Sequence, residues 1–201
     1  AMDDPTFIAV SGKSNYKTLE DLVSASKKGA LNWGVAQIGG TEHIGLAQFA
    51  KEAGIKFKVV PFGSGAQMVQ ALMAGKIDAT LPNVSEAANQ VADGSFRALA
   101  VMAENRLKDY PNVPSTYEKG IKAKCSTTRG YAVLASTPQP IIDQISKAMV
   151  KAMKHDVFSS YLSGAGLTVE SSVAGTKIWD KHLKAEYKIA ASALKELGLV
   201  K

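Results

Sequence analysis

The chain has 201 residues, of which 46% are hydrophobic and 21% are charged, a composition typical of a globular protein. It contains no run of about 18 apolar residues and no leader pattern, so we expect no membrane-spanning helix and an export signal already removed. The net charge of +6 is spread along the chain. This spread disfavours nucleic-acid binding and leaves a solvated surface or attraction of an anionic ligand.

Short apolar runs alternate with helical patterns through the first two thirds of the chain. Strands are expected over residues 6–11, 31–36, 57–60, 77–81 and 97–102, with helices over 18–29, 41–53, 66–74 and 85–92. Thr18 and Asp21 form a capping-box pair, and Gly54 is a C-terminal cap. Strands and helices alternating at this length favour parallel βαβ units.

The last third of the chain has a different pattern. Residues 103–124 are polar and contain prolines, which predicts an irregular crossing segment. Beyond it we expect a strand over 130–134, a helix over 138–154, a short helix closed by Gly164 and Gly166, a strand over 167–170, and a long helix capped by Gly198. One face of the long helix carries Trp179, Leu183, Tyr187, Ala190 and Leu194.

Two glycine-bearing turns, residues 34–43 and 60–66, each lead from a strand into a helix. A helix N-terminus offers unpaired N–H groups and a partial positive charge, so such a turn can hold an anion. The alternative is that the glycines only make tight turns. Because ligands of open α/β sheets bind beyond the carboxyl ends of strands, we expect ligand contacts here. The candidate residues are Gln37, Ile38, Gly39, Gly40, Thr41, His43, Gly63, Ser64, Gly65 and Asn83.

Other chemistry finds little support in the sequence. There is no nucleotide-binding glycine motif and no nucleophile elbow, and the three histidines are far apart, so we expect no cofactor and no metal. His43 is interpreted as a helix-packing residue in preference to a catalytic base. Cys125 is the single cysteine, which favours a structural thiol over a catalytic one. Arg106 and Arg129 remain open between a ligand carboxylate, an ion pair and solvent.

A collinear series of motifs covers nearly the whole chain. It consists of the turns at 34–43 and 60–67, Gly-Lys-Ile-Asp at 75–78, Gly-Ser-Phe-Arg-Ala-Leu-Ala-Val at 94–101 followed by Arg106, Pro-Asn-Val-Pro-Ser-Thr-Tyr-Glu-Lys-Gly at 111–120, and Thr137-Pro138. This series resembles the substrate-binding receptors of tripartite tricarboxylate transporters, the Bug or TctC family. Two positions depart from the family's loop motif: Val35 replaces the usual Ser, and Gln37 replaces a Gly.

The resemblance implies an α/β fold of the type II periplasmic-binding-protein class, with two lobes of mostly parallel sheets flanked by helices. On this basis residues 10–122 form one complete lobe, and residues 123–201 form the C-terminal half of the other. The first half of that second lobe, which carries the other ligand-binding loop, is expected to be missing. We therefore expect exposed apolar helix faces on residues 123–201, with self-association or loose packing.

The function implied by the resemblance is capture of a small mono-, di- or tricarboxylate in the bacterial periplasm and its delivery to membrane transporter subunits, without catalysis. The alternative is the effector domain of a transcription regulator, which shares the fold and the approximate length. Such a domain normally follows a helix-turn-helix segment, and the sequence contains none. An enzyme is disfavoured because no nucleophile and base occur at a recognisable spacing.

Overall fold

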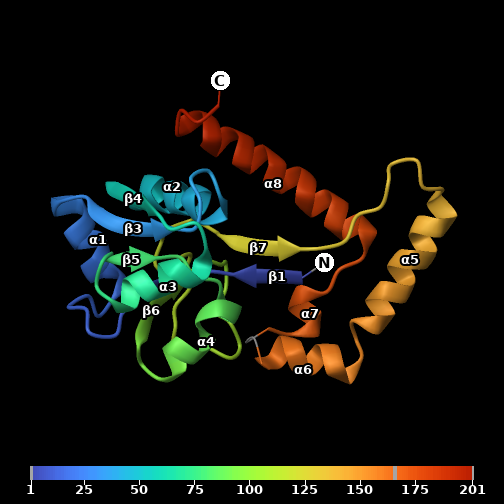
Figure 1. The fold of residues 1–201 in the computed structure, drawn as a ribbon, viewed down its shortest axis with the longest axis horizontal. Helices are drawn as coiled ribbons and strands as arrows, with labels where there is room; N and C mark the ends of the chain where they lie inside the picture. Colours follow the sequence, from blue (N-terminus) through green and yellow to red (C-terminus); the bar gives the residue numbers. More distant parts are fainter. Residues whose placement is uncertain (1, 165–166, 201) are drawn as a thin grey trace.

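A computed structural model describes residues 2–164 and 167–200 (Figure 1). Its strands are β1 (Met2–Pro5), β2 (Phe7–Ser11), β3 (Leu31–Val35), β4 (Phe57–Pro61), β5 (Ala79–Thr80), β6 (Phe96–Val101) and β7 (Ser126–Arg129). Its helices are α1 (Leu19–Lys28), α2 (Thr41–Ala53), α3 (Gly65–Met73), α4 (Val84–Ala92), α5 (Gln139–Ala152), α6 (Asp156–Gly164), α7 (Val169–Ser172) and α8 (Thr176–Glu196).

Local signals explain where the first helices begin and end. The Thr18 side chain accepts a hydrogen bond from the Asp21 backbone N–H, and the Asp21 carboxylate accepts one from the Thr18 N–H, which completes the predicted capping box. Helix α2 ends at Gly54, whose φ of 64° lies in the left-handed region that glycine adopts without strain. These boundaries confirm the prediction from sequence.

The central sheet has five strands in the order β4-β3-β5-β2-β6. Strand β3 pairs in parallel with β4 and β5, as predicted, but β2 pairs antiparallel with both β5 and β6. The predicted parallel βαβ units are present at β3, β4 and β5, and β2 is the antiparallel exception within the sheet. The physical reason is that β2 follows β1 directly through Thr6, without a crossover helix, and so enters the sheet from the opposite end.

Helices cover both faces of this sheet, and the alternation of side chains along β2 feeds two apolar cores. Ile8 and Val10 join the core under α1 and α2, together with the fully buried Trp33 and Phe49. Phe7, on the opposite face of the sheet, joins the core under α3 and α4. The sheet and its four helices thus form a well-packed body over residues 7–101.

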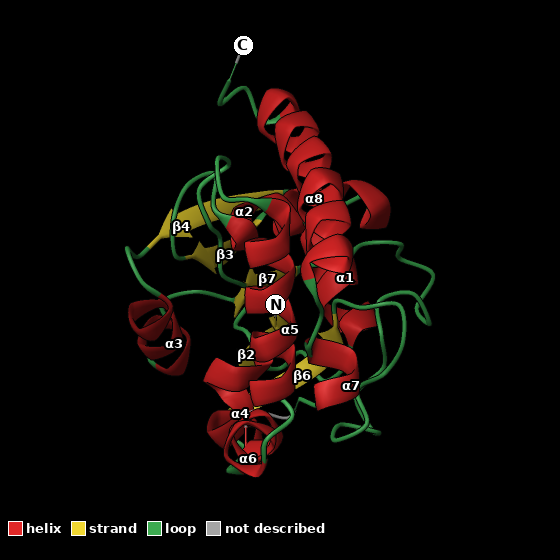
Figure 2. Ribbon diagram, turned by 90° about the vertical axis from the view of Figure 1, so that its right-hand side faces the viewer, coloured by secondary structure: helices red, strands yellow, loops and turns green. Residues whose placement is uncertain are grey.

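Strands β1 and β7 form a separate two-stranded antiparallel sheet that lies between this body and helices α5 to α7 (Figure 1). Figure 2 views the molecule from the side of α5 and shows α5 and α8 as separate rods. The buried apolar cluster of this part has two members, Leu162 and Leu167, among the described residues. Many large apolar side chains are exposed here, including Tyr131, Leu134, Ile141, Ile145, Val157, Ile178, Leu183 and Tyr187.

Two predicted strands in the last third were wrong. Residues 130–134 are irregular, and Tyr131 and Leu134 are 72% and 79% exposed, because no strand in the described residues lies alongside them. Residues 169–172 form the short helix α7 instead of a strand. The actual strand, β7, is polar and was missed, because its pairing with the equally polar β1 leaves no apolar alternation in sequence. The predicted helix closure at Gly166 lies outside the described residues.

Candidate functional site

The two predicted glycine turns lie side by side in the structure. The Phe62 N–H donates to the Val35 carbonyl at 3.0 Å, and the Gly63 N–H donates to the Ala36 carbonyl at 2.8 Å. Helices α2, α3 and α4 follow the parallel strands β3, β4 and β5, so their N-termini are delivered to one edge of the sheet. This edge, at the carboxyl ends of the strands, is where α/β proteins bind ligands.

The first turn uses its own donors to hold its shape. Gly39 has a φ of 76°, which favours glycine, and its N–H donates to His43 Nδ1 at 3.0 Å. The Gly40 N–H donates to the Gln37 carbonyl at 3.1 Å. Gly40 also leaves the N-cap of α2 without a side-chain bond. The donors facing a ligand are therefore those of the first turn of α2, starting at the exposed Thr41, because the first N–H groups of a helix have no intrahelical partner.

His43 has a structural role in this geometry. Its side chain is buried, packs edge-to-face against Phe57, and accepts the Gly39 hydrogen bond, which requires an unprotonated Nδ1. Burial lowers the pKa of His43, which keeps the imidazole neutral. This arrangement agrees with the predicted helix-packing role and fixes the shape of the first turn.

The second turn is closed by its own cap. Gly63 has a φ of 78°, and the Ser64 hydroxyl accepts a hydrogen bond from the Gln67 N–H at 3.4 Å, which caps α3. Gly65 allows a close approach: a Cβ placed there would lie 3.0 Å from Glu86 Oε2. A carboxylate of the protein itself therefore lies against the N-terminus of α3.

Asn83 connects α4 to the two-stranded sheet. Its Nδ2 donates to the Asp4 carbonyl at 2.7 Å, and its Oδ1 accepts from Thr127 Oγ1 at 3.1 Å. The side chain is buried and makes these two bonds to β1 and β7. In this structure, the Asn83 side chain links the start of α4 to β1 and β7. Its predicted contact with a ligand stays a prediction.

Three acidic residues at this edge were missed from the sequence: Asp4, Glu42 and Glu86. The Asp4 carboxylate is fully buried and accepts bonds from the Ser85 N–H and hydroxyl at the start of α4. A Cβ on Gly40 would lie 3.6 Å from Glu42 Oε2, which places Glu42 beside the first turn. Glu42 and Glu86 could have been found from their positions in the first turns of predicted helices, but Asp4 carries no local signal.

These charges act on one another. The pKa of Glu86 is raised, mainly by burial and further by repulsion from Asp4 and Glu42, while a hydrogen bond from the Asn83 backbone and the charge of Arg129 act in the opposite direction. The edge is thus an electrostatically coupled cluster with three carboxylates and the guanidinium of Arg129.

Two further candidates from the sequence, Arg106 and Cys125, have structural roles. Arg106 donates to the Glu118 carboxylate at 2.8 Å and to the Pro111 carbonyl, so it is an ion-pair residue of the crossing segment. Cys125 is buried, and its Sγ lies 3.5 Å from the Thr41 carbonyl under α2. A structural role for this thiol agrees with its packing.

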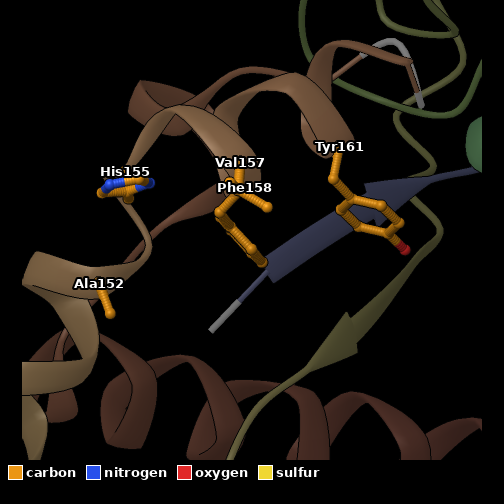
Figure 3. A pocket seen from close by; sticks show the side chains of 5 residues that line it. All are labelled: Ala152, His155, Val157, Phe158 and Tyr161. Carbon is orange, nitrogen blue, oxygen red and sulfur yellow. The ribbon is translucent and has the colours of Figure 1, made fainter.

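A pocket of about 680 Å³ lies away from the glycine turns, at the corner between α5 and α6 (Figure 3). Figure 3 shows His155 and Tyr161 at its two ends with Val157 and Phe158 between them. Its lining is apolar apart from these ends, and it has none of the convergent polar groups of a ligand site.

Among residues 2–164 and 167–200, no group of three or more His, Cys, Asp or Glu side chains is arranged to hold a metal ion. Of the helices in the described part of the chain, none combines the length and apolar character needed to cross a membrane.

The fold is that of periplasmic substrate-binding receptors. A family profile described as tripartite tricarboxylate transporter family receptor, TctC, matches residues 2–198. The chain belongs to the TctC family, whose members are periplasmic solute-binding receptors. The alternative of a transcription-regulator effector domain finds no support in this match.

Individual relatives agree with this family. A UPF0065 protein of Agrobacterium vitis is 27% identical over 186 residues, covering 90% of this chain and 54% of the relative. The crystal structure of a TctC solute-binding protein from Polaromonas, without ligand, has a TM-score of 0.83 and 25% identity, covering 97% of this chain and 67% of that one. An R. palustris protein solved with adipate has a TM-score of 0.82 and 21% identity, covering 98% and 66%. The chain therefore spans about half the length of its Agrobacterium relative.

Proposed function

We propose that the chain is part of a periplasmic receptor that captures a small organic carboxylate and delivers it to the membrane subunits of a tripartite tricarboxylate-type transporter. The observation that carries this proposal is the pairing of the two glycine turns, which delivers the N-termini of α2 and α3 to one edge of a TctC-family sheet. The adipate bound by the R. palustris relative is an acid of the proposed class.

The ligand contacts of this proposal are the predicted turn residues, with Thr41 as the principal side-chain donor. Gln37, Ile38 and Thr41 are exposed, whereas the N–H groups of Gly39 and Gly40 make bonds within the turn. A carboxylate binding here would be held by the first turn of α2 and by bridging waters. No catalysis is proposed, because binding at a helix N-terminus requires neither a nucleophile nor a base.

The experiment is calorimetry of the protein with a panel of mono-, di- and tricarboxylates that includes adipate. Thr41→Val should weaken the binding of the preferred acid by about tenfold, or ~1.4 kcal/mol, because the first-turn hydroxyl is lost. Thr176→Val is the matched control, since α8 also begins with an uncapped glycine followed by threonine. Failure of every acid to bind, or steady product formation detected by NMR, would refute the proposal.

The two parts of the chain have separate roles in this proposal. Residues 10–122 act as one lobe, and residues 123–201 contribute helices to a second. Support comes from the contrast between the buried cores under α1 to α4 and the exposed apolar side chains of α5 and α8. We propose that the 201-residue chain by itself associates with a second copy through these exposed faces, which light scattering would measure.

A further inference from the structure

The structure distinguishes two arginines, Arg106 and Arg129, that were equivalent candidates from the sequence. Both guanidinium groups form an ion pair of similar length, 2.8 Å for Arg106 and 2.9 Å for Arg129, and both side chains are about half exposed, at 46% and 45%. Arg106 also donates to the Pro111 carbonyl and lies in the crossing segment. Arg129 ends β7, and its charge acts on Glu86 at the edge where the helix N-termini are delivered.

We infer that Arg129 is a ligand-binding residue of the proposed receptor site, where its guanidinium holds a carboxylate of the captured acid. This inference rests on the proposed function. The ligand would then be held by a side chain of β7 as well as by the backbone N–H groups of the glycine turns. The end of the ligand that faces Arg129 must carry a negative charge.

A buried partner holds the guanidinium in place. Arg129 Nη1 donates to Oδ2 of Asp4, whose carboxylate is fully buried and is also bonded by Ser85. An arginine carries five N–H donors in a planar fork, so one bond to Asp4 leaves an exposed face for a second carboxylate. Because Asp4 already restrains the side chain, binding an acid would lose less conformational freedom than at a free arginine.

The other charges at this edge make Arg129 the place for a negative group. Glu86 lies against the N-terminus of α3, and Glu42 lies beside the first turn of α2. These two carboxylates and the buried Asp4 repel an anion, whereas the half-exposed guanidinium of Arg129 attracts it. An acid would therefore point its carboxylate toward Arg129 and an uncharged or hydrogen-bond-donating part toward Glu86. The prediction has opposite signs for these two residues: loss of Arg129 weakens binding, and neutralisation of Glu86 strengthens it.

The test measures the affinity of the protein for adipate and malate by calorimetry at low salt. Arg129→Lys keeps the charge but loses the fork, and it should bind at least tenfold more weakly. Arg106→Gln is the matched control and should bind within about twofold of the wild type, while Glu86→Gln should bind more tightly. A double variant, Asp4→Asn with Arg129→Gln, removes the ion pair without leaving a buried carboxylate unpaired, and its fold is checked by circular dichroism.

Each outcome has a distinct meaning. Weaker binding by both Arg129 variants, with normal binding by Arg106→Gln, supports the inference. Equal affinity of folded Arg129 variants and wild type overturns it and leaves the receptor function intact. A wild-type protein that binds neither these acids nor any other in the carboxylate panel refutes the proposed function, and the assignment of Arg129 with it.

Discussion

The two parts of this chain contain helices of similar amphipathic pattern that reach very different degrees of burial. Helix α1 buries Leu19 and Leu22 in the core against the central sheet. Helix α5 is longer, yet none of its residues is buried, and Ile141 and Ile145 are 47% and 39% exposed. The comparison shows that an amphipathic pattern specifies a helix, whereas burial and most of the stability depend on the neighbour that the pattern meets.

Helix α8 shows both situations within one element. Its last turns lie over α2: Ala193 is buried, Lys51 pairs with Glu196 at 3.1 Å, and a Cβ on Gly39 would lie 3.3 Å from Leu194. Its middle turns are open, with Tyr187 at 76% exposed. The end of α8 therefore packs with the first part of the chain, although it comes last in sequence (Figure 1).

The largest expected effect contrasts Phe49 with Tyr187. Phe49→Ala should destabilise the protein by about 3–5 kcal/mol, because it removes a fully buried ring from the core under α2. Tyr187→Ala should change the free energy of unfolding by no more than about 0.5 kcal/mol, because its side chain has little contact to lose. Urea denaturation followed by circular dichroism measures both. The measurement is made at a protein concentration at which light scattering shows a monomer, because association through α8 would cover Tyr187. Equal costs in the monomer would show that α8 is covered within the chain itself and would break the comparison.

A smaller difference in stability is expected between substitutions at the end and in the middle of α8. Leu194→Ala should cost about 1–2 kcal/mol, because this partly buried side chain packs over the first glycine turn. Leu183→Ala, in the same helix and with the same change of side chain, should cost about 0.5 kcal/mol or less, since Leu183 is 46% exposed. Thermal denaturation of the pair at the same monomeric protein concentration provides the test, and a reversed order would show that the end of α8 is not docked on α2.

The smallest effect concerns the pH dependence of the first glycine turn. Burial lowers the pKa of His43 below its ordinary value of 6.5, so the unfolded chain takes up a proton first as the pH falls. The stability contributed by neutral His43 is complete above 6.5 and is lost as the pH falls below that value toward the folded pKa.

The loss should be about 1 kcal/mol, the typical contribution of one hydrogen bond, since protonation removes the acceptor for the Gly39 N–H. It is measured as the difference in unfolding free energy between about pH 7.5 and about pH 5.5. His43→Gln should remove this component, while His155→Gln, an exposed control, should keep it. An unchanged pH profile in His43→Gln would exclude His43 as the titrating group.

The sequence was informative where a signal is local. The caps at Thr18 and Gly54, and the alternation of strands and helices to residue 102, were all predicted, because each depends on neighbours a few residues away. The pairing of β1 with β7 was not predicted, because these polar strands are held by hydrogen bonds between segments far apart in the sequence. At the site, the two turns were predicted, but the approach of Glu86 to Gly65 depends on how two helices pack, which no spacing in the sequence reveals.

The pairing of β1 with β7 also has a consequence for how the chain folds. Residue 2 pairs with residue 129, and β2 depends on β6 because Phe7 pairs with Val101. β1 and β2 precede β7 and β6 in the chain, so their backbone groups cannot pair with these strands until segments more than ninety residues later have taken their places. Such long-range closure slows folding more than it lowers final stability, because the loop entropy must be lost before the contacts form. Until that pairing, β1 and β2 present unpaired strand edges open to intermolecular strand pairing, and assistance by a chaperone should raise the folding yield more than any stabilising substitution in α5.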